Sequence, residues 1–134
     1  MARTPTRIGF SYWLARFISG LFTRTWIRRR VLHSDRVPET GGVILASNHV
    51  SYLDPFYMVC SVRRLVIALA RASAYKVPLL GTMLHSWGVI PVDQSGSGRG
   101  LKTFFTRLSA GDAVMIYPEG TRSHTGQIQA PQPG

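Results

Sequence analysis

The sequence predicts an α/β fold in which a mixed or parallel sheet is flanked by helices. Short apolar runs typical of buried strands recur along the chain, over residues 43–47, 65–69, 89–92 and 113–117. Between these runs, apolar residues recur three and four positions apart, which is the spacing of one helix face. Strands that alternate with helices in this way are typical of a layered α/β architecture.

The first predicted strand and helix are bounded by clear turn signals. A turn over residues 37–42, which ends in two glycines, leads into the strand over 43–47. A helix then begins near Pro55 and ends at residues 63–64, and the buried strand over 65–69 follows.

The second half of the domain has two further helices. The first covers residues 75–87, starts around Pro78 and stops at Gly88. Pro91 cannot donate to a strand ladder, so its strand is expected at a sheet edge or a bulge. The last helix ends at Gly111 and carries four apolar residues at helical spacing: Leu101, Phe104, Phe105 and Leu108.

Composition indicates one globular domain that binds an anionic partner. The chain has 134 residues, of which 45% are hydrophobic and 16% charged, unlike a disordered protein. Its one cysteine, Cys60, lies in an apolar stretch, which indicates a buried small side chain and excludes an internal disulfide. Sixteen Lys and Arg against six Asp and Glu give a formal net charge of +10, so nucleic acid and anionic lipid are the partners to consider.

Residues 1–30 favour the lipid. They hold seven of the sixteen basic residues and no acidic residue, and no recognised nucleic-acid motif follows them. Large apolar side chains lie among the arginines at the spacing of one helix face: Phe10, Trp13, Leu14, Phe17, Ile18 and Leu21. Such a helix suits the interface of an anionic membrane. The alternative is an ordinary helix packed on the domain.

The same segment lacks the features of a membrane span or a secretory signal. Its uninterrupted apolar stretch is shorter than the ~20 residues that cross a bilayer, and it has no clear small-residue cleavage site. We therefore expect residues 1–30 to lie on the membrane surface, with the protein peripheral on the cytoplasmic face of the cell membrane.

The sequence from Asn48 to Pro55 follows the first predicted strand and carries a His and an Asp. In open α/β sheets the carboxyl ends of strands are where ligands bind. Asp54 is expected to be the N-cap of the next helix, with Pro55 at its first position. There Asp54 can meet His49, fix its tautomer and stabilise the imidazolium that forms when the His takes a proton.

A second polar loop follows the strand over 113–117. It reads Pro-Glu-Gly-Thr-Arg-Ser and covers residues 118–123. Gly120 lets the backbone approach a ligand closely. Arg122 offers a planar fork suited to phosphate, and the neighbouring hydroxyls of Thr121 and Ser123 add donors.

Together the two loops resemble the motifs of the glycerolipid acyltransferase family, and most of all its bacterial 1-acylglycerol-3-phosphate acyltransferases. The match consists of His-x4-Asp within Asn-His-x-Ser-x-x-Asp, followed by Pro-Glu-Gly-Thr-Arg-Ser, and extends from about Arg30 to the last residue. It implies a glycerol-3-phosphate acyltransferase-like α/β domain over residues 31–134. Further strands and helices follow in that family, so the domain is expected to be an incomplete N-terminal part with an exposed sheet edge.

The resemblance implies a role for each matching residue. His49 is the general base that removes the proton of an acceptor hydroxyl, whose oxygen attacks an acyl thioester, and Asp54 supports it. The implied substrate-binding residues are Asn48, Ser51, Glu119, Gly120, Thr121 and Arg122. The implied reaction moves a fatty acyl group from acyl-CoA or acyl-carrier protein to 1-acylglycerol-3-phosphate (a lysophosphatidate), giving phosphatidate, with no covalent acyl-enzyme, cofactor or metal.

One segment departs from the family's pattern. Residues 88–99 align with a third family motif, Gly-x-x-x-(Val/Ile)-x-Arg, but Gln94 stands where the motif has arginine. Arg99, near a predicted helix start that favours anions, is expected to replace it in binding the substrate. Arg71, after another strand end, is a further anion-binding candidate.

Other functions stay open on the sequence alone. The acceptor can be another lysophospholipid or an aminolipid. A catalytically silent lipid-binding protein is favoured by the absence of the family's later Val/Ile-Pro motif, and is opposed by the intact pair of His49 and Asp54. A metal site built on this pair lacks a third ligand, so no metal is expected.

Overall fold

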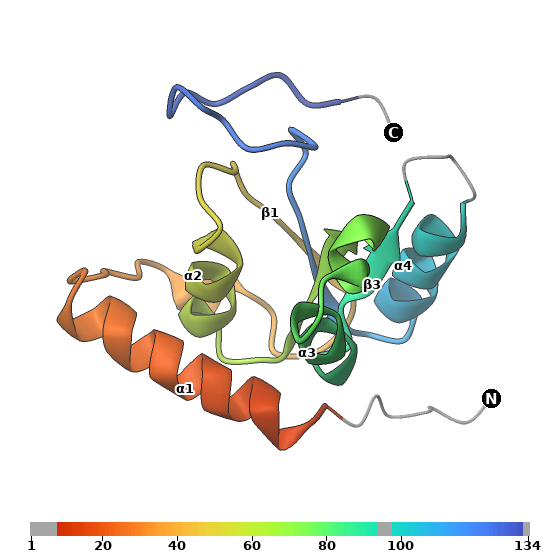
Figure 1. Cartoon of the computed structure of the whole chain (residues 1–134). Helices are drawn as coiled ribbons and strands as arrows, with labels where there is room; N and C mark the ends of the chain where they lie inside the picture. Colours follow the sequence, from red (N-terminus) through yellow and green to blue (C-terminus); the bar gives the residue numbers. More distant parts are fainter. Residues whose placement is uncertain (1–7, 94–97, 133–134) are drawn as a thin grey trace.

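Four short strands form one parallel sheet in the computed structural model of this chain, which describes residues 8–93 and 98–132 (Figure 1). In chain order the strands are β1 (Val43–Ala46), β2 (Val66–Arg71), β3 (Ile90–Val92) and β4 (Ala113–Ile116). Their order across the sheet is β1-β4-β2-β3, and all three neighbouring pairs are parallel. The predicted α/β fold is therefore confirmed. The sequence left a mixed or a parallel sheet open, and the described strands form a parallel sheet.

Helices cover both faces of this sheet. The described α-helices are α1 (Phe10–Thr25), α2 (Asp54–Ser61), α3 (Leu80–Ser86) and α4 (Arg99–Ser109). Two short 3₁₀ segments, Ser34–Arg36 and Ala72–Lys76, join them to the strands. On the α2 side, buried residues from the two central strands pack with α2 and the residue after it: Val62, Val66, Ala113 and Met115. On the other side, α4 contacts β3 and β4 and buries Phe104.

The central strands carry most of the core because they are covered on both faces. Ile67 and Val114 are fully buried, as are Val66 and Met115, which alternate with them along the strands. The outer strand β1 is different, because Ile44 is 43% exposed. Pro91 lies in β3, the outer strand on the opposite side, so the predicted edge position is confirmed.

The predicted helix over residues 75–87 is wrong in its first half. A 3₁₀ turn over Ala72–Lys76 replaces it, and α3 begins only at Leu80. The cause is Pro78, which pushes the preceding residue, Val77, into an extended conformation with φ −78° and ψ 122°. Leu79 then takes a positive φ of 66°, which no continuous helix allows.

The last helix, α4, agrees with its predicted position but buries less than its spacing suggested. Phe104 is buried, whereas Leu101 and Phe105 are 57% and 54% exposed. Gly111 ends the helix with a φ of 91°, and its N–H donates to the carbonyl of Leu108. The loop that precedes α4, including Gln94, lies outside the described residues.

The N-terminal helix α1 packs on the domain through the face opposite to its apolar stripe. Tyr12 and Thr23 are buried, and α1 lies against α2. The guanidinium of Arg16 donates to the carbonyls of Val62 and Arg64, which joins α1 to the chain between α2 and β2.

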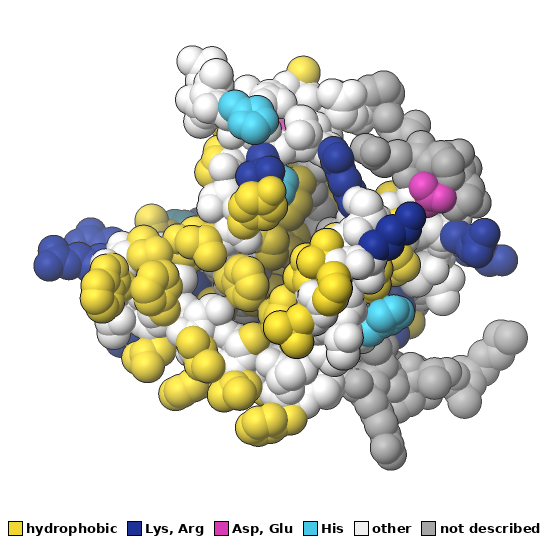
Figure 2. All heavy atoms as spheres, in the orientation of Figure 1, with side chains coloured by type: hydrophobic (Ala, Val, Ile, Leu, Met, Phe, Trp, Pro, Cys, Tyr) yellow, Lys and Arg dark blue, Asp and Glu magenta, His cyan; other side chains and the backbone are white. Residues whose placement is uncertain are grey.

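The predicted stripe on α1 remains on the surface, where its side chains are between 45% and 80% exposed. Figure 2 shows hydrophobic side chains gathered along this helix, with basic side chains at one end of the same face. The stripe consists of Phe10, Trp13, Leu14, Phe17, Ile18 and Leu21. In the part of the chain that the structure describes, no helix has the length and apolar character needed to cross a bilayer.

We expect Ile67→Ala to lower the free energy of unfolding by about 2–5 kcal/mol, because Ile67 is fully buried on the central strand β2. Ile44→Ala is the matched control, since the same side chain is 43% exposed on β1 and should cost much less. Urea unfolding followed by circular dichroism measures both values. Equal losses for the two variants would contradict the described core.

Candidate active site

The two polar loops predicted from sequence meet at the carboxyl ends of β1 and β4. These strands are neighbours in parallel register, with Ala46 opposite Ile116. The N–H of Ser47 donates to the carbonyl of Ile116 at 3.2 Å, and the N–H of Ser123 donates to the carbonyl of His49 at 2.7 Å. The backbone itself therefore holds the first loop, with His49, against the second loop, with Arg122.

His49 and Asp54 are in direct contact on the first loop. Nδ1 of His49 lies 2.9 Å from Oδ2 of Asp54, and their side chains are 18% and 14% exposed. The same Oδ2 atom accepts hydrogen bonds from the N–H groups of Val50 and Ser51, each at 2.7 Å. One carboxylate oxygen thus fixes both the imidazole ring and the backbone that carries it.

The predicted N-cap role of Asp54 is wrong. Leu53 occupies the N-cap position of α2, and Asp54 is the first residue of the helix with Pro55 in the same turn. The carboxylate points back to the N–H groups of the preceding loop instead of forward to those of the helix. This direction is what places it beside His49.

The ionisation of Asp54 suits a base-supporting role. Burial by itself raises the pKa of the Asp54 carboxyl, but the hydrogen bonds from His49, Ser51 and Val50 outweigh it, so that its pKa lies below the ordinary value. An ionised carboxylate beside Nδ1 favours the tautomer with the proton on that nitrogen. The lone pair on Nε2 is then available to accept a proton.

Tyr117 packs against the face of the imidazole ring, whereas Asp54 contacts its edge at Nδ1. Its ring stacks on His49 with a centroid distance of 4.0 Å and an interplanar angle of 15°. Burial, together with the charge of Asp54, raises the pKa of the Tyr117 phenol well above its ordinary value, so the ring stays neutral. Sequence reasoning missed this residue, although its place directly after β4 was a usable signal once β4 is known to neighbour β1.

The second loop contains a buried carboxylate and a tight turn. Glu119 is only 3% exposed, and within residues 8–93 and 98–132 neither of its carboxylate oxygens has a hydrogen-bond partner. Gly120 adopts a φ of 68°, which favours glycine, and its N–H donates to the carbonyl of Tyr117 at 3.0 Å. Thr121 is exposed at the surface, whereas Ser123 is buried.

Arg122 reaches across to the first loop. Its guanidinium lies 3.6 Å from the ring centroid of Tyr52, and Nη2 donates to the Tyr52 hydroxyl at 2.8 Å. Arg71, at the end of β2, donates from Nη2 to the carbonyl of Gly120 at 3.5 Å. The loop that follows β4 therefore carries one cation, Arg122, and is contacted by a second, Arg71.

The remaining predicted residues are less closely tied to this cluster. Ser51 accepts a hydrogen bond at Oγ from the N–H of Leu53, and Asn48 is exposed on the same loop. Arg99 is exposed at the first position of α4, and no described contact joins it to His49 or Arg122. Among residues 8–93 and 98–132, no group of three or more His, Cys, Asp or Glu side chains is placed to hold a metal ion.

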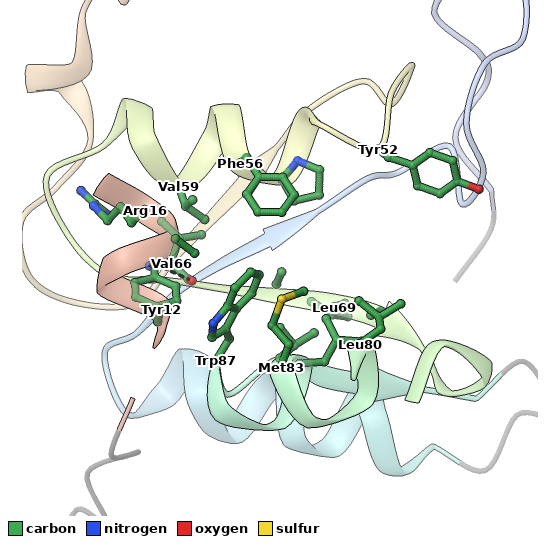
Figure 3. Close-up of a pocket in the computed structure, with 16 residues that line it drawn as sticks. Tyr12, Arg16, Tyr52, Phe56, Val59, Val66, Leu69, Leu80, Met83 and Trp87 are labelled. Atoms are coloured by element: carbon green, nitrogen blue, oxygen red, sulfur yellow. Dashed lines mark hydrogen bonds between the residues drawn. The ribbon is translucent and has the colours of Figure 1, made fainter. Parts of the chain in front are cut away.

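An apolar groove of about 190 Å³ begins beside this cluster and runs between α1, α2, β2 and α3. Figure 3 shows Tyr52 at one end and Tyr12 and Arg16 at the other, with side chains of α2 and α3 facing each other between them. The other labelled side chains that line it are Phe56, Val59, Val66, Leu69, Leu80, Met83 and Trp87. Its lining suits a hydrocarbon chain.

The acyltransferase family model matches residues 28–134. Among curated relatives, the 1-acyl-sn-glycerol-3-phosphate acyltransferase of Pseudomonas aeruginosa is 33% identical over 123 residues, which cover 89% of this chain and 45% of the relative. The protein of the same name from Borreliella burgdorferi is 27% identical over 103 residues, or 74% of this chain and 41% of the relative.

A solved structure is similar in fold. The 1-acyl-sn-glycerophosphate acyltransferase PlsC from Thermotoga maritima superposes with a TM-score of 0.67 at 23% identity, covering 89% of this chain and 49% of that protein. The chain thus spans less than half the length of these relatives.

We expect Asp54→Asn to destabilise the protein in a pH-dependent way. Because the pKa of Asp54 is lowered on folding, its ionised form stabilises the fold above about pH 4, and this contribution is lost as the pH falls through the folded-state pKa. Loss of its charged hydrogen bonds should lower the free energy of unfolding by roughly 2 kcal/mol at neutral pH, and this difference should shrink as the pH falls below about 4.

The control for this comparison is Asp35→Asn, because Asp35 is exposed. Unfolding curves of the three proteins across pH measure the effect. A difference between wild type and Asp54→Asn that does not change with pH would contradict the ionised state of this carboxylate.

Proposed function

This chain belongs to the acyltransferase family, and we propose that it transfers a fatty acyl group from acyl-CoA or acyl-carrier protein to the free hydroxyl of 1-acylglycerol-3-phosphate, giving phosphatidate. The observation that carries the proposal is the contact of 2.9 Å between His49 and Asp54, held beside the loop that contains Arg122. The names of the relatives from Pseudomonas aeruginosa and Borreliella burgdorferi agree with this acceptor.

In the proposed reaction His49 acts as a general base. A free alcohol is a poor nucleophile at neutral pH, so Nε2 takes its proton as the oxygen attacks the carbonyl carbon of the acyl thioester. The ionised Asp54 stabilises the imidazolium, which then returns the proton to the departing thiolate. The carbon–oxygen ester bond forms and the carbon–sulfur bond breaks. General-base help of this kind is worth about 10²–10⁴-fold in rate.

Arg122 and Arg71 are the proposed ligands of the acceptor phosphate. Arg122 belongs to the loop that follows β4 and contacts Tyr52 of the first loop, and Arg71 contacts Gly120 of the loop that follows β4. A guanidinium binds two phosphate oxygens at once through parallel N–H groups. A phosphate held there would anchor the glycerol so that its free hydroxyl faces His49, which lies on the adjoining loop.

The groove and helix α1 are proposed to handle the lipid part of the substrates. The groove begins at Tyr52, beside the reactive loops, and its lining is almost entirely apolar, so an acyl chain can lie in it with the carbonyl near His49. The exposed stripe of α1 and the arginines that follow it suit an anionic membrane surface, to which the protein would bind peripherally.

We expect His49→Ala to lower the rate of acyl transfer by at least about 100-fold, because it removes the general base. His85→Ala is the control, since His85 is exposed on α3 and outside the proposed site. The measurement is the phosphatidate formed from labelled lysophosphatidate with acyl-CoA or acyl-carrier protein as donor. Circular dichroism spectra verify that both variants are folded like the wild type. Turnover in His49→Ala equal to that of the control would refute the base role.

We expect the double variant Trp13→Ser/Phe17→Ser to bind anionic vesicles about tenfold less tightly, since two large apolar side chains would no longer enter the interface. Phe105→Ser removes an equally exposed aromatic side chain from α4 and serves as the control. Sedimentation with phosphatidylcholine vesicles, with and without phosphatidylglycerol, measures binding. Equal binding by both variants would show that α1 does not face the membrane.

A further inference from the structure

Tyr52 connects three parts of the candidate site. It belongs to the first loop, three residues after His49, and its ring and hydroxyl contact Arg122 of the second loop. It also lines the end of the apolar groove nearest these loops (Figure 3). The mechanism proposed above gives this residue no role, although it touches the group proposed to bind the phosphate.

The position of the Arg122 guanidinium depends on Tyr52. One interaction is the stacking of the cation on the ring at 3.6 Å, and the other is the hydrogen bond of 2.8 Å to the hydroxyl. Within residues 8–93 and 98–132, this is the only hydrogen bond that the structure shows for the Arg122 side chain. Most of the five N–H groups of the guanidinium are therefore left for a ligand.

The loop that carries Tyr52 is itself fixed. The carboxylate of Asp54 accepts hydrogen bonds from His49 and from the N–H groups of Val50 and Ser51. Tyr52 follows these residues directly, and the N–H of Leu53 donates to Oγ of Ser51 at 3.1 Å. A single hydrogen-bonded turn thus carries both the imidazole and the ring that holds Arg122.

We propose that Tyr52 is a positioning residue for a phosphate-bearing acceptor, which it serves by holding the Arg122 guanidinium in register with His49. The proposal rests on the function proposed above and adds a determinant of acceptor specificity to it. The aromatic face keeps the cation in place without neutralising it, because the ring contributes no formal charge. Phosphate can then bind the remaining N–H groups of Arg122 on a loop that the backbone holds against the loop of His49.

Two substitutions separate the ring from the hydroxyl. Tyr52→Leu removes the aromatic face and should raise KM for lysophosphatidate about two- to fivefold, with kcat changed little, because only binding of the acceptor is weakened. Tyr52→Phe keeps the face and should stay close to wild type. Phe105→Leu, at an exposed aromatic position on α4, is the matched control.

The decisive experiment is a double-mutant cycle with Arg122→Ala. If Tyr52 acts through Arg122, then Tyr52→Leu should raise KM in the wild-type background and add nothing in the Arg122→Ala background. The same cycle is measured on the dissociation constant of glycerol 3-phosphate by calorimetry. Monoacylglycerol, an acceptor without phosphate, should show no effect of Tyr52→Leu.

Several results would overturn the inference. A lower KM in Tyr52→Leu would mean that Tyr52 competes with phosphate for Arg122. Additive effects of the two substitutions, or an equal loss with monoacylglycerol, would place its action in the groove or the fold.

The function proposed above fails separately. If acyl transfer depends on His49 but the effects of Tyr52→Leu and Arg122→Ala on KM are additive, only the role of Tyr52 is overturned. If the wild-type chain has no acyl-transfer activity, the proposed function is overturned. Non-additive effects of Tyr52→Leu and Arg122→Ala on the dissociation constant of glycerol 3-phosphate would still support the role of Tyr52. No binding of glycerol 3-phosphate by the wild type overturns both the phosphate site and that role.

Discussion

One oxygen of the Asp54 carboxylate accepts three hydrogen bonds, from Nδ1 of His49 at 2.9 Å and from the N–H groups of Val50 and Ser51 at 2.7 Å each. The rest of the candidate site depends on this atom. It orients the imidazole, closes the turn that carries the ring, and fixes the start of α2 against the end of β1. A charge at this point also stabilises a proton on the imidazole, so the same contact serves structure and chemistry.

The parallel sheet brings the second loop to this turn. β1 and β4 are distant in sequence but adjacent in the sheet, so their carboxyl ends lie side by side. Tyr117 consequently stacks on the imidazole at 4.0 Å, and Arg122 reaches Tyr52. The apolar groove begins at the same place because α2 starts directly after the turn. An imidazole, a guanidinium and an apolar groove thus lie together at the carboxyl ends of neighbouring strands, where open α/β sheets bind ligands.

Local patterns were enough to predict some of this arrangement. The alternation of apolar runs and helical spacing predicted the strands and most helices, and the loops with His49 and Arg122 were correctly placed at strand ends. The membrane role of α1 stays a prediction, but its apolar stripe is on the surface. What spacing could not indicate is which face of α1 would pack, because Tyr12 and Arg16 dock through specific contacts with the segment 62–66.

Other features depend on which strands are neighbours. The contacts of Tyr117 with His49 and of Tyr52 with Arg122 require β1 beside β4, and residue periodicity carries no information on strand order. The N-cap role of Asp54 failed for a related reason, since the local motif does not say whether a carboxylate turns toward its helix or back to the loop. Arg99 was chosen to replace the arginine of a family motif because it lies near a helix start, and among the described residues no contact joins it to His49 or Arg122.

The measurement that tests this account most directly is the ¹⁵N NMR spectrum of the neutral form of the His49 imidazole in the wild-type protein, identified by titration. We expect the tautomer of this form that carries its proton on Nδ1, donated to Asp54, and an unprotonated Nε2. In Asp54→Asn this preference should weaken, because the charge that selects the tautomer is gone. A neutral His49 ring that carries its proton on Nε2 in the wild type would contradict the central claim that Asp54 orients the imidazole with Nε2 free to accept a proton.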